Sequence, residues 1–283
     1  MTAPPLQDLA SALAVAGGLF LVLWGLCLVP LAHLVQVVQA GGRRGAAWLL
    51  RSGVGRWAAA HPGPLGAYGP ALLLLGAGGL AALAAGHLFV ELAEQLRLTT
   101  SATWRVDRAV HAWVGEGRRP ALTLLLRAAT WAGGTAGLTT LVALAAALLL
   151  LRRERPAALF LVVTSGAGAL LNVGLKLLFG RARPDLAVAI AEADGFSFPS
   201  GHAMGSFVIC GALAYLVLRR PGSWAGRSAG LALALTAVLL VGLSRVYLGV
   251  HWASDIAGGW SAGAVWLAAA VTTTELLALR APR

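Results

Sequence analysis

Long apolar stretches separated by short polar segments dominate the pattern of this sequence. Stretches of spanning length lie at about 10–38, 70–93, 122–151, 156–179, 202–218, 228–248 and 252–279. A helix needs about 20 apolar residues to cross the hydrocarbon core of a bilayer. Helices also satisfy their own backbone hydrogen bonds there, which an isolated strand cannot do. The pattern therefore predicts an all-α integral membrane protein with seven transmembrane helices.

The stretches divide the chain into two predicted parts. Residues 1–66 would form an N-terminal transmembrane helix and a cytoplasmic interfacial linker, because the segment 40–66 is rich in glycine and proline. Residues 67–283 hold the other six stretches and would form a six-helix transmembrane domain. The segment 94–120 mixes charged residues with two tryptophans, which predicts an amphipathic helix lying in the membrane interface.

Composition supports the membrane assignment and excludes one other class of function. Of the 283 residues, 58% are hydrophobic and 12% are charged, whereas soluble domains have roughly a quarter charged residues. The net charge of +11 is spread over short inter-helix segments. A nucleic-acid-binding protein would gather such charge into a patch or stripe. The two cysteines, Cys27 and Cys210, lie far apart within apolar stretches and predict no disulfide.

Arginines at the ends of the stretches predict the orientation. They cluster at 43–56, 152–155, 219–227 and 280–283, four places that lie on one side of a seven-span protein. The positive-inside rule makes this side cytoplasmic. The N-terminus and the alternate helix ends would then be extracytoplasmic, in a multi-pass protein of the cell (inner) membrane.

Three polar clusters mark the predicted extracytoplasmic helix ends, and the first is Lys176-(x6)-Arg183-Pro184. Lys176 is the only lysine of the chain. The spacing of seven residues is two helical turns, so both cations would project from one face. Asn172 would share that face, and Pro184 would end the helix at Arg183. Taken alone, the pair could equally be cations at a helix end that reach toward the membrane surface.

The second cluster is Pro199-Ser200-Gly201-His202, at the start of the fifth stretch. Ser200 is a favourable N-cap, and Gly201 lets a ligand approach the backbone closely. Free amides at a helix N-terminus attract anions. His202 would stand beside a bound anion as a proton donor, although the cluster alone is also typical of an ordinary helix start.

The third cluster is Ser244-Arg245-(x5)-His251-(x3)-Asp255. His251 and Asp255 are four residues apart at the start of the last helix, so their side chains should meet. A carboxylate on one ring nitrogen leaves the other nitrogen available as a nucleophile or base. A structural hydrogen bond or half of a metal site would use the same pair. The sequence offers no further ligands at the expected spacing, which disfavours the metal.

The three clusters together resemble the signature of the type 2 phosphatidic acid phosphatase superfamily. That signature is Lys-x6-Arg-Pro, then Pro-Ser-Gly-His, then Ser-Arg-x5-His-x3-Asp, and every position of it is matched. The resemblance covers the six-helix unit and leaves out the first stretch and its linker. It implies an integral membrane lipid phosphatase with a six-helix core, to which this chain adds one N-terminal helix.

The resemblance also implies a role for each motif residue. His251 would be the nucleophile that forms a phosphohistidine, Asp255 would orient it, and His202 would protonate the leaving group and later activate water. The phosphate-binding residues would be Lys176, Arg183, Ser200, Gly201 and Arg245. Fixed cations of this kind stabilise the charge of a phosphoryl group in transit. Neither a metal nor a cofactor is expected.

The substrate implied is a lipid phosphomonoester or diphosphate that reaches the site sideways from the outer leaflet. Phosphatidic acid, phosphatidylglycerophosphate and a polyprenyl diphosphate such as undecaprenyl diphosphate all fit. A lipid phosphotransferase using the same intermediate and a non-catalytic lipid-binding or transport relative stay open as alternatives. The related vanadate haloperoxidases are soluble, so the predicted spans argue against that activity. The sequence does not predict an oligomeric state.

Overall fold

The structure, a computed structural model, describes residues 65–185, 189–220 and 223–280. Their secondary structure is entirely helical, which confirms the all-α prediction for this part of the chain. The predicted first span and nearly all of its linker lie outside the described residues. The helices are α3 (Leu65–Gln95), α4 (Ala102–Glu116), α5 (Pro120–Ala132), α6 (Thr135–Leu151), α7 (Arg155–Phe179), α8 (Gly201–Arg219), α9 (Trp224–Tyr247) and α10 (Ala253–Arg280).

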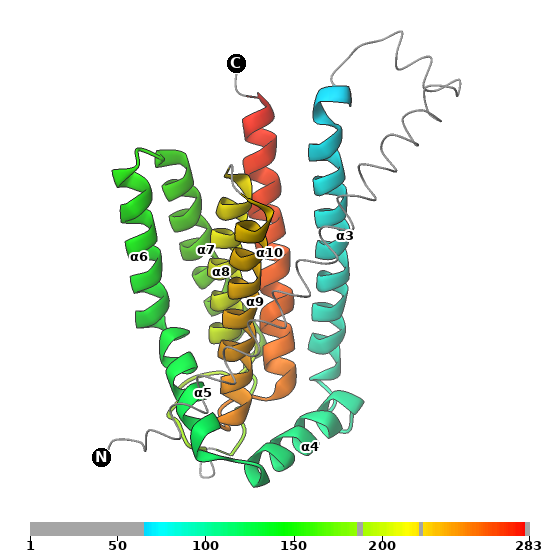
Figure 1. The fold of residues 1–283 in the computed structure, drawn as a ribbon. Coiled ribbons are helices and arrows are strands. Elements are labelled where there is room, and N and C mark those ends of the chain that lie inside the picture. Colours follow the sequence, from blue (N-terminus) through cyan, green and yellow to red (C-terminus); the bar gives the residue numbers. More distant parts are fainter. Residues whose placement is uncertain (1–64, 186–188, 221–222, 281–283) are drawn as a thin grey trace.

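The long helices run side by side, and α4 lies across one end of them (Figure 1). Helix α8 packs against α7, α9 and α10, and α10 also packs against α3. Helix α4 contacts α3, α9 and α10 at that end. Its crosswise position agrees with the interfacial helix predicted within 94–120.

Within the described residues, four helices are long and apolar enough to cross a membrane: α7, α8, α9 and α10. A fifth candidate span is the pair α5 and α6, which are bent by 57° relative to each other. This part of the chain therefore contains four or five candidate spans. The count of seven spans stays a prediction.

The predicted stretch 122–151 is not one continuous helix. The helix breaks between Ala132 and Thr135, where two successive glycines intervene. Glycine is a poor helix former, and Gly134 adopts the extended conformation of an N-cap. A Cβ on Gly133 would lie 2.2 Å from a methyl group of Val241 on α9. The break therefore lets α5 turn and pack closely against α9.

The polar clusters and the arginine-rich connections lie at opposite ends of the bundle (Figure 1). The connections after α6 and α8 and the end of α10 share one end. The segments 180–185, 189–200 and 248–252, which carry much of the three clusters, lie at the other end together with α4. The predicted separation is thus confirmed for the connections after α6 and α8 and the end of α10, while the assignment of one end to the cytoplasm stays a prediction.

Replacing Gly259 by alanine is expected to destabilise the protein by about 1–3 kcal/mol, the usual cost of overpacking. A Cβ there would lie 2.8 Å from the Ser200 carbonyl oxygen and 2.9 Å from the Ala203 Cβ. The backbone at the start of α8 would have to move. The matched control is Gly174→Ala on α7, whose Cβ would meet no atom within 4 Å. Thermal melting in detergent measures both, and equal melting temperatures would contradict the prediction.

Candidate active site

The first cluster does not lie on one helix face as predicted. Helix α7 ends at Phe179, because Gly180 takes a left-handed conformation (φ +55°) that favours glycine. Arg183 lies three residues after Gly180, in the connection to α8. Lys176 is in the last turn of α7 and donates a hydrogen bond to the Phe196 carbonyl of that connection. The two cations therefore approach the site from a helix and from a loop.

Arg183 is held by backbone carbonyl groups on both sides of the site. Its Nη1 donates to the Val250 carbonyl at 2.8 Å, and its Nη2 donates to the Asp194 carbonyl at 2.7 Å. The same Nη1 lies 3.1 Å from Nε2 of His251. Burial lowers the pKa of Arg183, and the charge of Asp255 opposes this shift. Arginine stays protonated in proteins, so a fixed cation touches the expected nucleophile.

The second cluster forms the start of α8 as predicted. Ser200 is the N-cap, and its side chain accepts a hydrogen bond from the Ala203 amide at 3.4 Å. The Ser200 amide donates to the Asp255 carbonyl oxygen at 3.0 Å, which joins α8 to α10. A Cβ on Gly201 would lie 3.0 Å from Oδ1 of Asn172. The end of α7 thus passes close to the start of α8, and a side chain at Gly201 would press on Asn172.

His202 and Arg245 face the break between α5 and α6. Nε2 of His202 lies 3.6 Å from the position of a Cβ on Gly134. Nη1 of Arg245 donates to Oγ1 of Thr130 at 2.6 Å. Ser244, the other member of the third cluster, is buried and donates to the Val241 carbonyl within its own helix, so its role here is local.

His251 and Asp255 meet as predicted, although His251 precedes α10 rather than lying in it. Nδ1 of His251 is 3.1 Å from Oδ2 of Asp255. Both side chains are almost fully buried. Ser197 lies between them, with its hydroxyl 3.3 Å from the same ring nitrogen and hydrogen-bonded to the same carboxylate oxygen.

The neighbours of His251 determine its tautomer. Arg183 can only donate, so Nε2 must accept and carries a lone pair. The proton then sits on Nδ1 and points to the Asp255 carboxylate. Burial lowers the pKa of His251 to about 4, against the raising effect of the hydrogen bond and charge of Asp255. At neutral pH the imidazole is uncharged, and Nε2 can attack an electrophile once the electrophile takes the place of Arg183 at its lone pair.

The stability of the protein is expected to fall as the pH drops from 6.5 toward 4, because His251 is buried in its neutral form. Its pKa rises to about 6.5 in the unfolded chain. Between these values the unfolded state binds more protons, so acid favours unfolding. Melting temperatures at pH 7 and pH 5 measure the effect. The variant His251→Gln cannot titrate there and should show a smaller dependence, and an equal dependence would refute the assignment.

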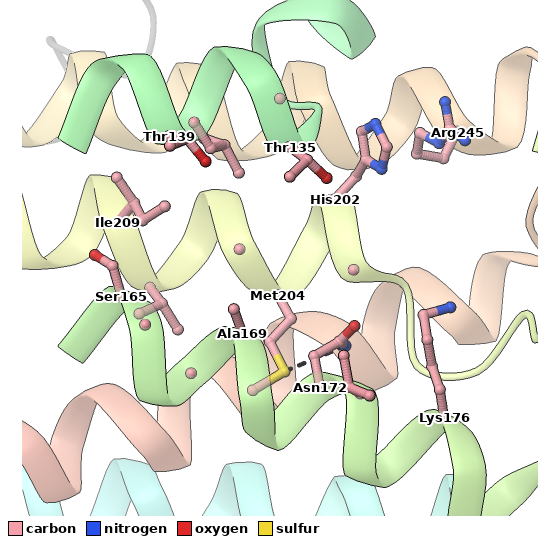
Figure 2. A pocket seen from close by; sticks show the side chains of 18 of the residues that line it. Thr135, Thr139, Ser165, Ala169, Asn172, Lys176, His202, Met204, Ile209 and Arg245 are labelled. Atoms are coloured by element: carbon pink, nitrogen blue, oxygen red, sulfur yellow. Dashed lines mark hydrogen bonds between the residues drawn. The ribbon is translucent and has the colours of Figure 1, made fainter. Parts of the chain in front are cut away.

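A cavity of about 700 Å³ opens beside these groups and extends between α6, α7 and α8. Lys176, Arg183, His202, Arg245 and His251 line it. Figure 2 shows His202 and Arg245 close together at one end of the view, with Ile209, Thr139 and Ser165 toward the other. Most of the remaining lining is apolar, including Leu138, Val142, Val162, Val173 and Val208. A charged end and an apolar body suit an amphiphile.

The side chains of Thr130, Ser197 and Arg181, outside the predicted set, bond to motif residues, and Asp107 bonds to Arg181 in turn. Arg181 forms ion pairs with Asp255 at 2.6 Å and with Asp107 at 2.8 Å. The sequence carries one signal for it, since Arg181 stands two residues before Arg183 in Arg-Ala-Arg-Pro. Nothing in the sequence distinguishes Asp107 from the other charges of 94–120.

Comparison with known proteins gives matches of three kinds. A sequence model described as the PAP2 superfamily matches residues 157–277. Phosphatidylglycerophosphatase B of Bacillus subtilis is 33% identical over 165 residues, which are 58% of this chain and 81% of that protein. Decaprenylphosphoryl-5-phosphoribose phosphatase of Mycobacterium tuberculosis is 38% identical over 109 residues, which are 36% of this chain and 55% of that protein.

One solved structure is similar over nearly its whole length. It is the crystal structure of a transmembrane PAP2 type phosphatidylglycerolphosphate phosphatase from Bacillus subtilis, with a TM-score of 0.63 and 28% sequence identity. The match covers 71% of this chain and 98% of that structure. A shorter sequence match, 38% identical over 72 residues, is to an undecaprenyl-diphosphatase of Sulfolobus acidocaldarius, covering 25% of this chain and 30% of that protein.

Proposed function

The chain belongs to the PAP2 superfamily and is a membrane lipid phosphatase of that family, and on this premise we propose that it hydrolyses a lipid phosphomonoester or diphosphate through a phosphohistidine on His251. The observation that carries the proposal is the environment of this imidazole. Nδ1 contacts the Asp255 carboxylate at 3.1 Å, and Nε2 faces the Arg183 guanidinium at 3.1 Å. The ring lines a largely apolar cavity.

The first step would be attack of Nε2 of His251 on phosphorus. The bond between phosphorus and the lipid oxygen breaks, and His202 donates a proton to that oxygen. The imidazole becomes positively charged as it bonds to phosphorus, and the adjacent Asp255 carboxylate stabilises this charge. Lys176, Arg183 and Arg245 would neutralise the phosphoryl oxygens, as preorganised cations do in phosphoryl transfer.

The second step would return the enzyme to its starting state. His202, now unprotonated, takes a proton from water, and the water oxygen attacks the phosphorus of phosphohistidine. The phosphorus–nitrogen bond breaks, inorganic phosphate leaves, and His251 regains its lone pair on Nε2. No step of this cycle calls for a metal or a cofactor.

The polarity of the cavity supports a lipid as substrate. Its charged end would hold the phosphate, while the valines and leucines of α6, α7 and α8 would surround the hydrocarbon next to it. Such a site takes the headgroup of a bilayer lipid with little exposure of the tail to water. The bundle end that carries the site would face the extracytoplasmic side, with the arginine-rich connections on the cytoplasmic side.

Phosphate release from a panel of lipids tests the proposal. The purified protein in detergent, with EDTA present, is given phosphatidylglycerophosphate, phosphatidic acid or undecaprenyl diphosphate. Phosphatidylglycerophosphate comes first because the relative of which this chain covers 81% is named for it. We expect release from at least one lipid. Dephosphorylated lipid without free phosphate would indicate transfer to another acceptor, and no reaction with folded protein would favour a non-catalytic protein.

A further inference from the structure

A buried ionic cluster joins the crosswise helix α4 to Asp255. Its members are Asp107 of α4, Arg181 of the connection after α7, and Ser254 and Asp255 of α10, all of them buried. Nη1 of Arg181 donates to Asp255 Oδ1 at 2.6 Å and to Ser254 Oγ at 2.7 Å. Its Nη2 donates to Asp107 Oδ2 at 2.8 Å. Asp107, Arg181 and Ser254 do not line the cavity, and their side chains connect to the site through Asp255.

The surroundings of Arg181 require an arginine. Its guanidinium carbon lies 4.4 Å from the ring centre of Trp104 and 5.6 Å from that of Trp252. A planar guanidinium can stack on aromatic rings and at the same time bond two carboxylates with different nitrogens. A lysine ammonium would supply the charge without this fork. Arg181 thus holds Asp107 and Asp255 in fixed positions relative to each other, and its charge attracts both carboxylates.

Asp107 also fixes the start of α10. Its Oδ1 accepts a hydrogen bond from the Ser254 amide at 2.9 Å, and its Oδ2 accepts one from the Ser254 hydroxyl at 2.5 Å. Asp255 in turn accepts from the Trp252 amide at 2.9 Å. In a capping box the side chain of the residue before the helix accepts a hydrogen bond from an amide of the first turn. The Trp252 side chain has no oxygen to accept one. Asp107 accepts it instead, from another helix.

Asp107 offsets the positive charge of Arg181. An isolated pair of Arg181 and Asp255 would carry no net charge, whereas two carboxylates that share Arg181 carry one net negative charge. This charge lies next to the imidazole of His251. Burial makes this charge matter, since charges interact more strongly away from water.

From these contacts we infer that Asp107 and Arg181 are positioning residues, which hold Asp255 in the orientation that His251 requires for attack. Helix α4 is then part of the catalytic apparatus although none of its residues lines the cavity. The inference rests on the proposed function. It extends the site beyond the three clusters to a helix that lies at the end of the bundle.

The variants Asp107→Asn and Arg181→Lys test the inference through steady-state kinetics. The amide introduced by Asp107→Asn can still accept from the Ser254 backbone but presents a donor to Arg181, which breaks the pair. We expect kcat to fall about 100-fold in each variant, the effect of a misplacement near 1 Å, with KM within about threefold because the phosphate cradle is intact. Glu116→Gln, the same chemical change at an exposed carboxylate of α4, is the control and should keep wild-type kcat.

The double variant decides between coupled and independent effects. If both residues act through Asp255, the double variant loses no more activity than the worse single variant. Multiplied losses, or a KM increase with unchanged kcat, would overturn the inference. Should either variant fold poorly, Ser254→Ala removes the hydroxyl that bridges the pair and is expected to lower kcat as well, and wild-type kcat in it would count against the inference.

A readout independent of turnover separates the inference from the proposed function. In protein with labelled histidines, the ¹⁵N chemical shifts of the His251 ring are compared between wild type and Asp107→Asn. We expect them to differ, because the partner of Nδ1 changes its orientation and charge. Identical shifts would refute the inference even in an active enzyme. Absence of phosphate release by the wild type would refute the proposed function instead.

Discussion

Replacing His251 by alanine is expected to abolish phosphate release, with kcat lowered by about 10⁶-fold, as when a hydrolase loses one member of a catalytic unit. The variant has no nitrogen to attack phosphorus, while the cations that bind the phosphate stay in place. Substrate binding should therefore survive. Initial rates of phosphate release, measured with the lipid that the wild type prefers, give the comparison.

A control and a trapping experiment make this prediction specific. His87→Ala removes an exposed histidine of α3 and should leave the rate unchanged. Quenching in alkaline detergent after mixing with ³²P-labelled substrate should leave label on the wild type that is stable to base and released by acid, and none on His251→Ala. Turnover that persists in His251→Ala would refute the proposed mechanism, and label retained on that variant would assign the nucleophile to another residue.

Replacing Arg183 by alanine is expected to lower kcat by about 10³-fold or more, within the range known for an arginine that stabilises a phosphoryl group in transit. Two effects add in this variant. The developing charge on the phosphoryl oxygens loses a cation, and the His251 ring loses the donor that orients it through Nε2. The measurement is kcat from saturation curves.

Arg183→Lys separates the two effects. The ammonium keeps the charge but cannot reach the Val250 and Asp194 carbonyls together with the imidazole, so we expect a loss smaller than that of the alanine variant and larger than tenfold. Arg108→Ala, at an exposed arginine of α4, is the control for removal of positive charge. Equal activity in Arg183→Lys and the wild type would mean that only charge matters at this position.

Much of the fold was predictable because membranes impose a strong length and polarity rule. Helices α7, α8, α9 and α10 coincide with the last four apolar stretches, and the clusters lie at the predicted common end. The break between α5 and α6 was not predictable from the apolar pattern, since Gly133 and Gly134 occur in a chain that carries glycine inside many of its helices. Close packing against Val241 of α9 requires a glycine at position 133.

The sequence also predicted the contact between His251 and Asp255, although it placed His251 within the helix. It mislocated Arg183, because Gly180 was not recognised as the end of α7. A glycine in a left-handed conformation ended the helix before the proline could. This error did not affect the prediction that Arg183 reaches the site. The connection between α7 and α8 carries Arg183 to the segment before α10, where Arg183 donates to the Val250 carbonyl.

The sequence alone predicts the groups available to this protein: apolar helices of spanning length, and three cations, two histidines and one carboxylate at their ends. Spacing along the chain is enough for this, because helix length, capping and contacts between residues four apart are local properties. Which groups support Asp255 depends on the tertiary structure. Asp107 and Arg181 are 74 residues apart, and a buried ion pair at that separation depends on how helices pack rather than on any local pattern.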